Sequence, residues 1–312
     1  MLEETNATAD IVIADVLDQF ARNFLLNDLT SEQSGKMLEA SHGERVFQLP
    51  RREARRRDTV IGQVHQARVS IRRLRSVLKA FIGLFDPDWS SPTLVELSWY
   101  AAVLGEIRDL DVLRSGIAKS LLLVEDEPIQ TVIKGRLDRR MDEAQERGAL
   151  ERSTKRYALL IDEIATIGTA VAFDARAKRP ALDVLSSQLK GTWRDVRRAA
   201  NKASNDSKNV NLHELRKELK RLQCACEVLG LVAGKPAVKV AQAAEATQTK
   251  LGVVHDEAVA SAWLKSLVVT EPHWKEPLRE IRAFHKEAHT DAKRGWRESI
   301  DDVDRRWHNL RG

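Results

Sequence analysis

A histidine followed by arginine and lysine residues at helical spacing is the feature of this sequence best suited to binding a charged ligand. An α-helix turns by about 100° per residue, so side chains three or four positions apart lie on one side of it. Five basic side chains in the segment 64–81 share an arc of about 80°, and its apolar side chains fall roughly opposite. The five are His65, Arg68, Arg72, Arg75 and Lys79.

The charge around this row indicates what kind of ligand it would bind. Residues 51–79 contain ten arginine and lysine residues against two acids, Glu53 and Asp58. Neighbouring like charges on one helix face cost about 0.2–0.5 kcal/mol each, and a bound anion would relieve that cost. The planar guanidinium group of arginine matches phosphate oxygens. We therefore expect a phosphate-bearing polyanion, with an ordinary solvated helix face as the alternative.

The cationic row occurs a second time in the segment 212–229. The residues that match its first three members are His213, Arg216 and Lys220. Gln223 and Glu227 stand where the first copy has its last two cations, so the first copy should bind an anion more strongly.

A second motif also recurs, in the same order and at nearly equal spacing. LGEIRD (104–109) follows the first cationic row, and LGVVHD (251–256) follows the second. Two motifs repeated in one order indicate an internal duplication with a pseudo-twofold arrangement. We expect Asp109 to pair with a basic helix, with Asp256 repeating that role. Glycine inside a helix is unfavourable, so the glycine of each motif should mark a close approach of helices.

Apolar periodicity predicts an all-α protein with almost no strand. Loop character is expected at 29–44 and in the polar connector 201–211, and the segment 51–58 reads as a solvated basic approach to the first cationic helix. Helices are expected at 8–27, 59–85, 92–121, 129–147, 151–172, 180–204, 211–230, 236–268, 275–291 and 295–309.

Composition and terminal sequence favour a soluble cytoplasmic protein. The 312 residues carry a net charge of +5, and aromatic residues make up 5% of them. Cys224 and Cys226 lie two positions apart without a distant partner, so no disulfide framework is expected. The N-terminal residues do not resemble a signal peptide. No apolar run approaches the roughly 20 residues of a membrane span.

Four motifs in order resemble the CHAD family, the conserved histidine α-helical domain. HQARVSIRRLRSVLKAF (65–81) and LGEIRDLDVL (104–113) are similar to the first pair of family motifs, and HELRKELKRLQ (213–223) and LGVVHDEAVA (251–260) to the second. The similarity runs from about residue 55 to the C-terminus. It implies two four-helix bundles related by pseudo-twofold symmetry, with a basic central cleft or pore. It also implies binding of inorganic polyphosphate and association with polyphosphate granules.

The resemblance also implies which residues bind and how the chain divides. It divides the chain into an N-terminal helix and loop (1–50), a first bundle half (51–205) and a second bundle half (206–312). Lower-ranked candidates on another helix are Arg194, Arg197 and Arg198. The binding positions it transfers are His65, Arg68, Arg72, Arg75, Lys79, His213, Arg216, Lys217 and Lys220.

Other functions compete with polyphosphate binding. His65 and His213 raise the possibility of a metal site, but such a site usually needs three or four ligands and arginines repel a cation, so no metal or cofactor is expected. No P-loop, nucleophile elbow, HExxH or dinucleotide fingerprint occurs, which argues against an enzyme. Sequence-neutral nucleic-acid binding remains an alternative, although both rows lack the aromatic residues on which bases stack. A role as an accessory protein of triphosphate or polyphosphate metabolism also stays open.

Overall fold

The computed structural model describes residues 7–28 and 60–311, and within them the fold is all-α, as predicted. The described residues contain no strand, only two isolated bridges. The loop expected at 29–44 and the basic segment 51–58 lie outside the described residues. The main helices are α1 (Ala9–Asp28), α3 (Val60–Ala80), α4 (Pro87–Ser120), α5 (Glu127–Arg152), α6 (Lys155–Thr166), α7 (Ala181–Asn205), α8 (Asn209–Ala233), α9 (Lys235–Thr270), α10 (Arg279–Ala292) and α11 (Trp296–Arg311).

Helix boundaries follow local capping more closely than apolar periodicity. Asp86 caps α4 by accepting a hydrogen bond of 2.9 Å from the backbone of Asp88, so this helix begins at Pro87, not at 92 as expected. The predicted connector 201–211 was too long, because α7 continues to Asn205 and α8 begins at Asn209. Ala203 is fully buried, and its packing keeps this polar stretch helical.

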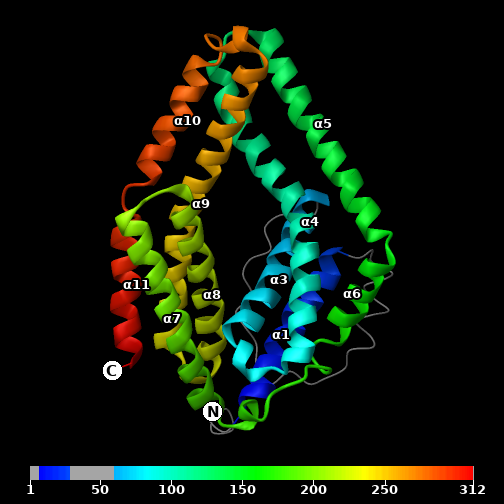
Figure 1. Cartoon of the computed structure of the whole chain (residues 1–312), viewed down its shortest axis with the longest axis vertical. Helices are drawn as coiled ribbons and strands as arrows, with labels where there is room; N and C mark the ends of the chain where they lie inside the picture. The colour runs from blue at the N-terminus through cyan, green and yellow to red at the C-terminus, as the bar shows by residue number, and fades with distance from the viewer. Residues whose placement is uncertain (1–6, 29–59, 312) are drawn as a thin grey trace.

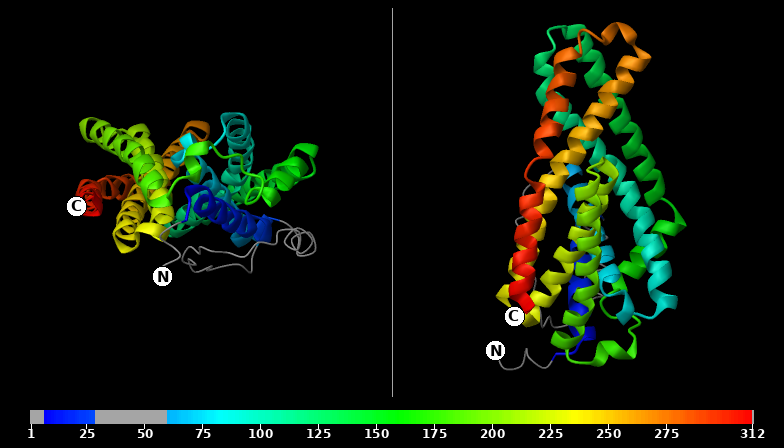
Figure 2. Two further views of the ribbon diagram at one scale, coloured as in Figure 1. Left: turned by 90° about the horizontal axis from the view of Figure 1, so that it is seen from below. Right: turned by 60° about the vertical axis from the view of Figure 1, so that its left-hand side comes forward.

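The helices form two groups that repeat one order of elements (Figures 1 and 2). In the first group α3 packs between α1 and α4, and in the second α8 packs between α7 and α9. Asp28, at the end of α1, accepts hydrogen bonds of 2.7 Å from the hydroxyls of Tyr100 on α4 and Tyr157 on α6. This packing groups α1 with the first half and α7 with the second. We therefore propose that the repeat divides between α6 and α7, not at residue 205.

The two groups meet at two separate places. At one end α3 contacts α8 within the main apolar core. At the other, the tips of the α4–α5 and α9–α10 hairpins share a second core, where Ile117 and Ile133 pack with Leu264, Trp274 and Leu278. Figure 1 shows the ribbons of α4 and α9 diverging between these contacts. Within the described residues, no helix combines the length and apolar character that crossing a membrane requires.

Candidate anion-binding site

Arginine and lysine side chains from α3 and α8 lie together where the two halves meet. Burial lowers the pKa of Arg72 to about 10, and the charges of Arg68 and Arg216 add to this effect. Burial also lowers the pKa of Lys220 to about 7, with Arg72 as the strongest of the neighbouring positive charges that contribute. These electrostatic effects, together with the packing of α3 against α8, place the four side chains in one region. We call Arg68, Arg72, Arg216 and Lys220 the paired cluster.

The paired cluster is only weakly neutralised by the residues that the structure describes. Nη2 of Arg68 donates a hydrogen bond of 2.9 Å to Oδ1 of Asp109, which confirms the predicted ion pair. Within the described ranges 7–28 and 60–311, Arg72, Arg216 and Lys220 form no ion pair. The cluster therefore combines partial burial with an excess of positive charge.

Buried donors without partners recur at equivalent positions of the two halves. Nε of Arg68 and Nε of Arg216 are buried and have no hydrogen-bond partner among the described residues. The same is true of Nδ1 in His65 and in His213. Buried polar atoms in proteins are nearly always hydrogen-bonded. The two arginine Nε–H groups are free to donate to a ligand oxygen, whereas each imidazole Nδ1 donates or accepts according to its tautomer.

The repeated glycines lie against arginine side chains. A Cβ atom added at Gly105 would lie 3.8 Å from Nε of Arg68, and one added at Gly252 would lie 3.5 Å from Nη2 of Arg216. At both positions the atoms within 4 Å belong to the arginine and not to the backbone of a neighbouring helix. The expectation that these glycines mark a close helix approach was therefore wrong, because a guanidinium group lies against each one.

Both repeated histidines favour the neutral form. Burial lowers the pKa of His65, and the positive charges of Arg108 and Arg68 lower it further. Burial likewise lowers the pKa of His213, together with Lys217 and His255. A neutral imidazole donates one hydrogen bond and accepts another, so these histidines can orient an anion or an arginine without contributing charge. Among the described residues, no group of three or more His, Cys, Asp or Glu could hold a metal ion.

Two residues of the second motif lie near the repeated histidines but were not predicted from the sequence as binding residues. Arg108 lies near His65 and also pairs with Asp111. His255, at the equivalent position of the second half, places its ring centroid 5.1 Å from that of His213. The signal was present in the sequence, because both residues occupy the fifth position of the repeated LGxxxD motif.

Three further candidates lie at the margin of the paired cluster. Burial lowers the pKa of Arg75, whose positive charge contributes to the lowered pKa of Arg72. Lys79 is exposed. Lys217 is also exposed and pairs with Glu214 at 2.7 Å. Their roles in binding stay predictions.

The candidates on α7 are solvent-exposed. Arg194 and Arg197 are exposed, and Arg198 pairs with Asp195 at 3.1 Å. Among the described contacts, none joins these arginines to the paired cluster. Their participation also stays a prediction.

Glu227, which interrupts the second cationic row, joins the two halves. Its carboxylate forms an ion pair with Arg73 of α3, and both side chains are mostly buried. The side-chain amide of Gln223 donates a hydrogen bond of 3.0 Å to the same carboxylate. The guanidinium carbon of Arg73 lies 5.0 Å from the ring centre of Phe20 on α1. The ion pair between Arg73 and Glu227 therefore joins the two halves, and its arginine is already paired with an acid of the protein.

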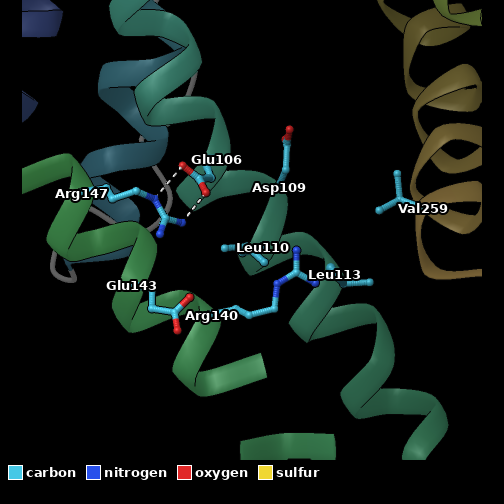
Figure 3. Close-up of a pocket in the computed structure, with 8 residues that line it drawn as sticks. All are labelled: Glu106, Asp109, Leu110, Leu113, Arg140, Glu143, Arg147 and Val259. Atoms are coloured by element: carbon cyan, nitrogen blue, oxygen red, sulfur yellow. Dashed lines mark hydrogen bonds and ion pairs between the residues drawn. The ribbon is translucent and has the colours of Figure 1, made fainter. Parts of the chain in front are cut away.

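A cavity of 270 Å³ beside the cluster has mixed charge (Figure 3). It lies mainly between α4 and α5, with Val259 of α9 on the opposite side. Arg147 forms an ion pair with Glu106 there, and Asp109 and Glu143 add two more acids to the lining. These carboxylates would repel phosphate, so we place the anion site at the paired cluster and not in this cavity.

Comparison with known proteins supports the fold and the family. Residues 43–265 match the CHAD domain. The chain is similar to the CHAD domain structure of the plant Ricinus communis (19% identity, TM-score 0.67, 96% of this chain and 93% of that one). It is also similar to PptA from Streptomyces chartreusis (16% identity, TM-score 0.57, 97% and 100% covered).

Two curated relatives are uncharacterized proteins, MT2285 and Rv2226, from two Mycobacterium tuberculosis strains. Each is 28% identical to this chain over 207 residues, which cover 63% of this chain. The match spans 39% of the length of these relatives.

Proposed function

This chain belongs to the CHAD domain family, and from that premise we propose that it binds inorganic polyphosphate at the paired cluster. CHAD domains are associated with triphosphate- and polyphosphate-related proteins and are generally non-catalytic. We propose the same non-catalytic role here, with the bound polymer directing the protein to polyphosphate granules.

The observation that carries this proposal is the proximity of Arg72 and Lys220. Burial lowers the pKa of both groups; the charges of Arg68 and Arg216 add to the effect at Arg72, and the charge of Arg72 adds to it at Lys220. Two buried positive charges side by side are unfavourable unless an anion joins them. Polyphosphate carries about one negative charge per phosphate, so a short stretch of it offers several charges to the four cations.

The repeated unpartnered donors support a ligand that carries several oxyanion groups. Arg68 and Arg216 each have a buried Nε without a partner. Guanidinium groups bind phosphate oxygens in a forked, charge-assisted geometry. Successive phosphates along a flexible chain present such oxygens repeatedly, which suits cations contributed by two helices.

Calorimetric titration with long-chain polyphosphate tests the proposal. We expect binding at low ionic strength that weakens steeply as salt is added, because each contacted phosphate releases counterions. Arg72→Ala with Lys220→Ala should abolish most of this binding. The matched control, Lys134→Ala with Arg139→Ala, removes two exposed cations of α5 and should change little. No binding by the unaltered chain, or equal losses in both double variants, would contradict the proposal.

Competition with RNA distinguishes the main alternative. At matched phosphate concentration, polyphosphate should displace single-stranded RNA from the chain. Stacking of bases on aromatic side chains usually strengthens sequence-neutral nucleic-acid binding. A clear preference for RNA would favour nucleic-acid binding instead.

A further inference from the structure

A second basic depression lies between α9 and α10, away from the paired cluster. This groove has a volume of 420 Å³, and residues of these two helices alone line it. No aspartate or glutamate lines it. Its polar lining consists of Ser261, Lys265, Arg279, Arg282, Lys286 and His289.

The charges of this groove are unbalanced, unlike those of the cavity in the other half. Lys265, Arg282 and Lys286 form no ion pair with any residue in the described part of the chain. The cavity between α4 and α5, by contrast, contains Glu106 and Glu143 beside its arginines (Figure 3). The excess of positive charge in this groove therefore has no counterpart in the α4–α5 cavity.

The groove also offers a buried hydroxyl donor. Oγ of Ser261 is buried and has no hydrogen-bond partner within the described part of the chain. A hydroxyl can donate to a phosphate oxygen from the wall of the groove while the surrounding cations balance the charge. No aromatic ring lines the groove, so it offers no surface on which a nucleic-acid base would stack.

One end of the groove contacts the helix that carries the second cationic row. Nε2 of His289 lies 3.1 Å from Oδ1 of Asn209, the first residue of α8. His213 follows Asn209 by four residues, so the two lie on the same face of α8 one turn apart. Arg216 of the paired cluster lies a further turn along. Helix α8 therefore carries both the contact with the groove and the second cationic row.

We propose that the α9–α10 groove is a second phosphate subsite, which holds one part of a polyphosphate chain while another part occupies the paired cluster. This inference rests on the proposed function. Binding of one chain at two linked sites raises affinity beyond that of either site alone. Long polyphosphate should therefore bind more tightly than tripolyphosphate, because a longer chain offers more phosphates to the two sites.

A pair of double variants separates this inference from the proposed function. Lys265→Ala with Arg282→Ala should weaken binding of long-chain polyphosphate by about tenfold, as expected for the loss of charge-assisted contacts. It should also reduce the slope of log affinity against log salt by roughly one, because fewer phosphates are neutralised. Binding of tripolyphosphate at the paired cluster should persist. The control is again Lys134→Ala with Arg139→Ala on α5, and circular dichroism checks that both variants fold.

Each other result has a distinct meaning. Unchanged long-chain affinity in the groove variant, or an equal loss in the control, would overturn the second subsite. A loss of RNA binding without a loss of polyphosphate binding would overturn it in favour of nucleic acid. Failure of the unaltered chain to bind polyphosphate of either length would contradict the proposed function itself.

Discussion

Arg68 and Asp109 are joined by a hydrogen bond of 2.9 Å, whereas Arg216, the counterpart of Arg68, forms no ion pair within the described residues. Asp109 is largely exposed at this contact. An acid that holds an arginine also competes with an anionic ligand for it. Burial raises the pKa of Asp256, the equivalent acid of the second half, and the charge of Arg216 opposes that rise. Asp256 and Arg216 form no ion pair within the described residues, so the halves differ in how an acid holds the arginine. That the first copy binds an anion more strongly stays a prediction.

We expect Asp109→Asn to strengthen polyphosphate binding. An exposed ion pair contributes about 0.2–1 kcal/mol, so release of Arg68 should raise affinity by up to about fivefold. Calorimetric titration of the variant beside the unaltered chain measures this change. Asp138→Asn, which releases exposed Arg114 from its ion pair between α4 and α5, provides a control in which affinity should not rise. A weakened affinity in Asp109→Asn would show that Asp109 is needed to position Arg68.

The repeated glycines should tolerate alanine but not a large side chain. A Cβ at Gly252 would lie in ordinary contact with Arg216, 3.5 Å from Nη2. Because alanine favours the helix over glycine, Gly252→Ala should stabilise the chain by about 0.5–1 kcal/mol, measured by thermal unfolding.

Gly252→Leu should instead displace the guanidinium group of Arg216 and reduce polyphosphate affinity. Circular dichroism would establish that this variant remains folded before its affinity is measured. Undiminished binding by a folded Gly252→Leu variant would argue against a role for the position of Arg216.

Polyphosphate binding should weaken as pH rises above 7. Burial holds the pKa of Lys220 at about 7, so the free site loses this charge above that pH, whereas a bound polyanion favours the protonated amine. Titrations between pH 7 and 9 should show this decline in the unaltered chain. The decline should be much smaller in Lys220→Arg, because arginine stays protonated throughout this range. Parallel declines in both proteins would contradict the assignment to Lys220.

The free energy of unfolding of the chain without bound polyphosphate should rise with pH, whereas its polyphosphate affinity should fall. Between the folded pKa of about 7 and the ordinary value of 10.5, the unfolded chain binds more protons at Lys220 than the folded chain does. The contribution of this group to the free energy of unfolding therefore rises with pH over that interval. Lys220→Met should remove this contribution and stabilise the free protein at pH 7 by ~1–4 kcal/mol, measured by urea unfolding.

Loss of Glu227 should destabilise the contact between the halves. Its partner Arg73 is mostly buried, so Glu227→Ala would leave an uncompensated charge there. Removal of one partner from a buried ion pair costs about 3–5 kcal/mol. Urea unfolding should detect this loss, and a further change of Arg73→Met in the same chain should recover much of it. Stability unaffected by Glu227→Ala would show that the pair is dispensable.

The sequence predicted the helices and the two basic rows but not the surroundings of each residue. Spacing alone predicted that Arg68 and Arg72 share one face, because residues four positions apart on an α-helix lie on the same side. The structural role of Glu227 depends on Arg73, which is 154 positions away, and no local pattern indicates that contact. The end of α7 at Asn205 lies one residue from the predicted end, but the expected connector 201–211 was too long, because α8 already begins at Asn209.

The equivalence of Arg68 and Arg216 has a consequence for which polymers fit. A nucleic-acid strand has unlike ends, so its sugars and bases would meet two binding surfaces related by a pseudo-twofold rotation in different orientations. A linear phosphate polymer has the same covalent structure in both directions, so its repeating units present the same oxygens in either orientation. If the proposed binding is correct, a duplicated site of this kind would suit a ligand without direction, which could bind from either end.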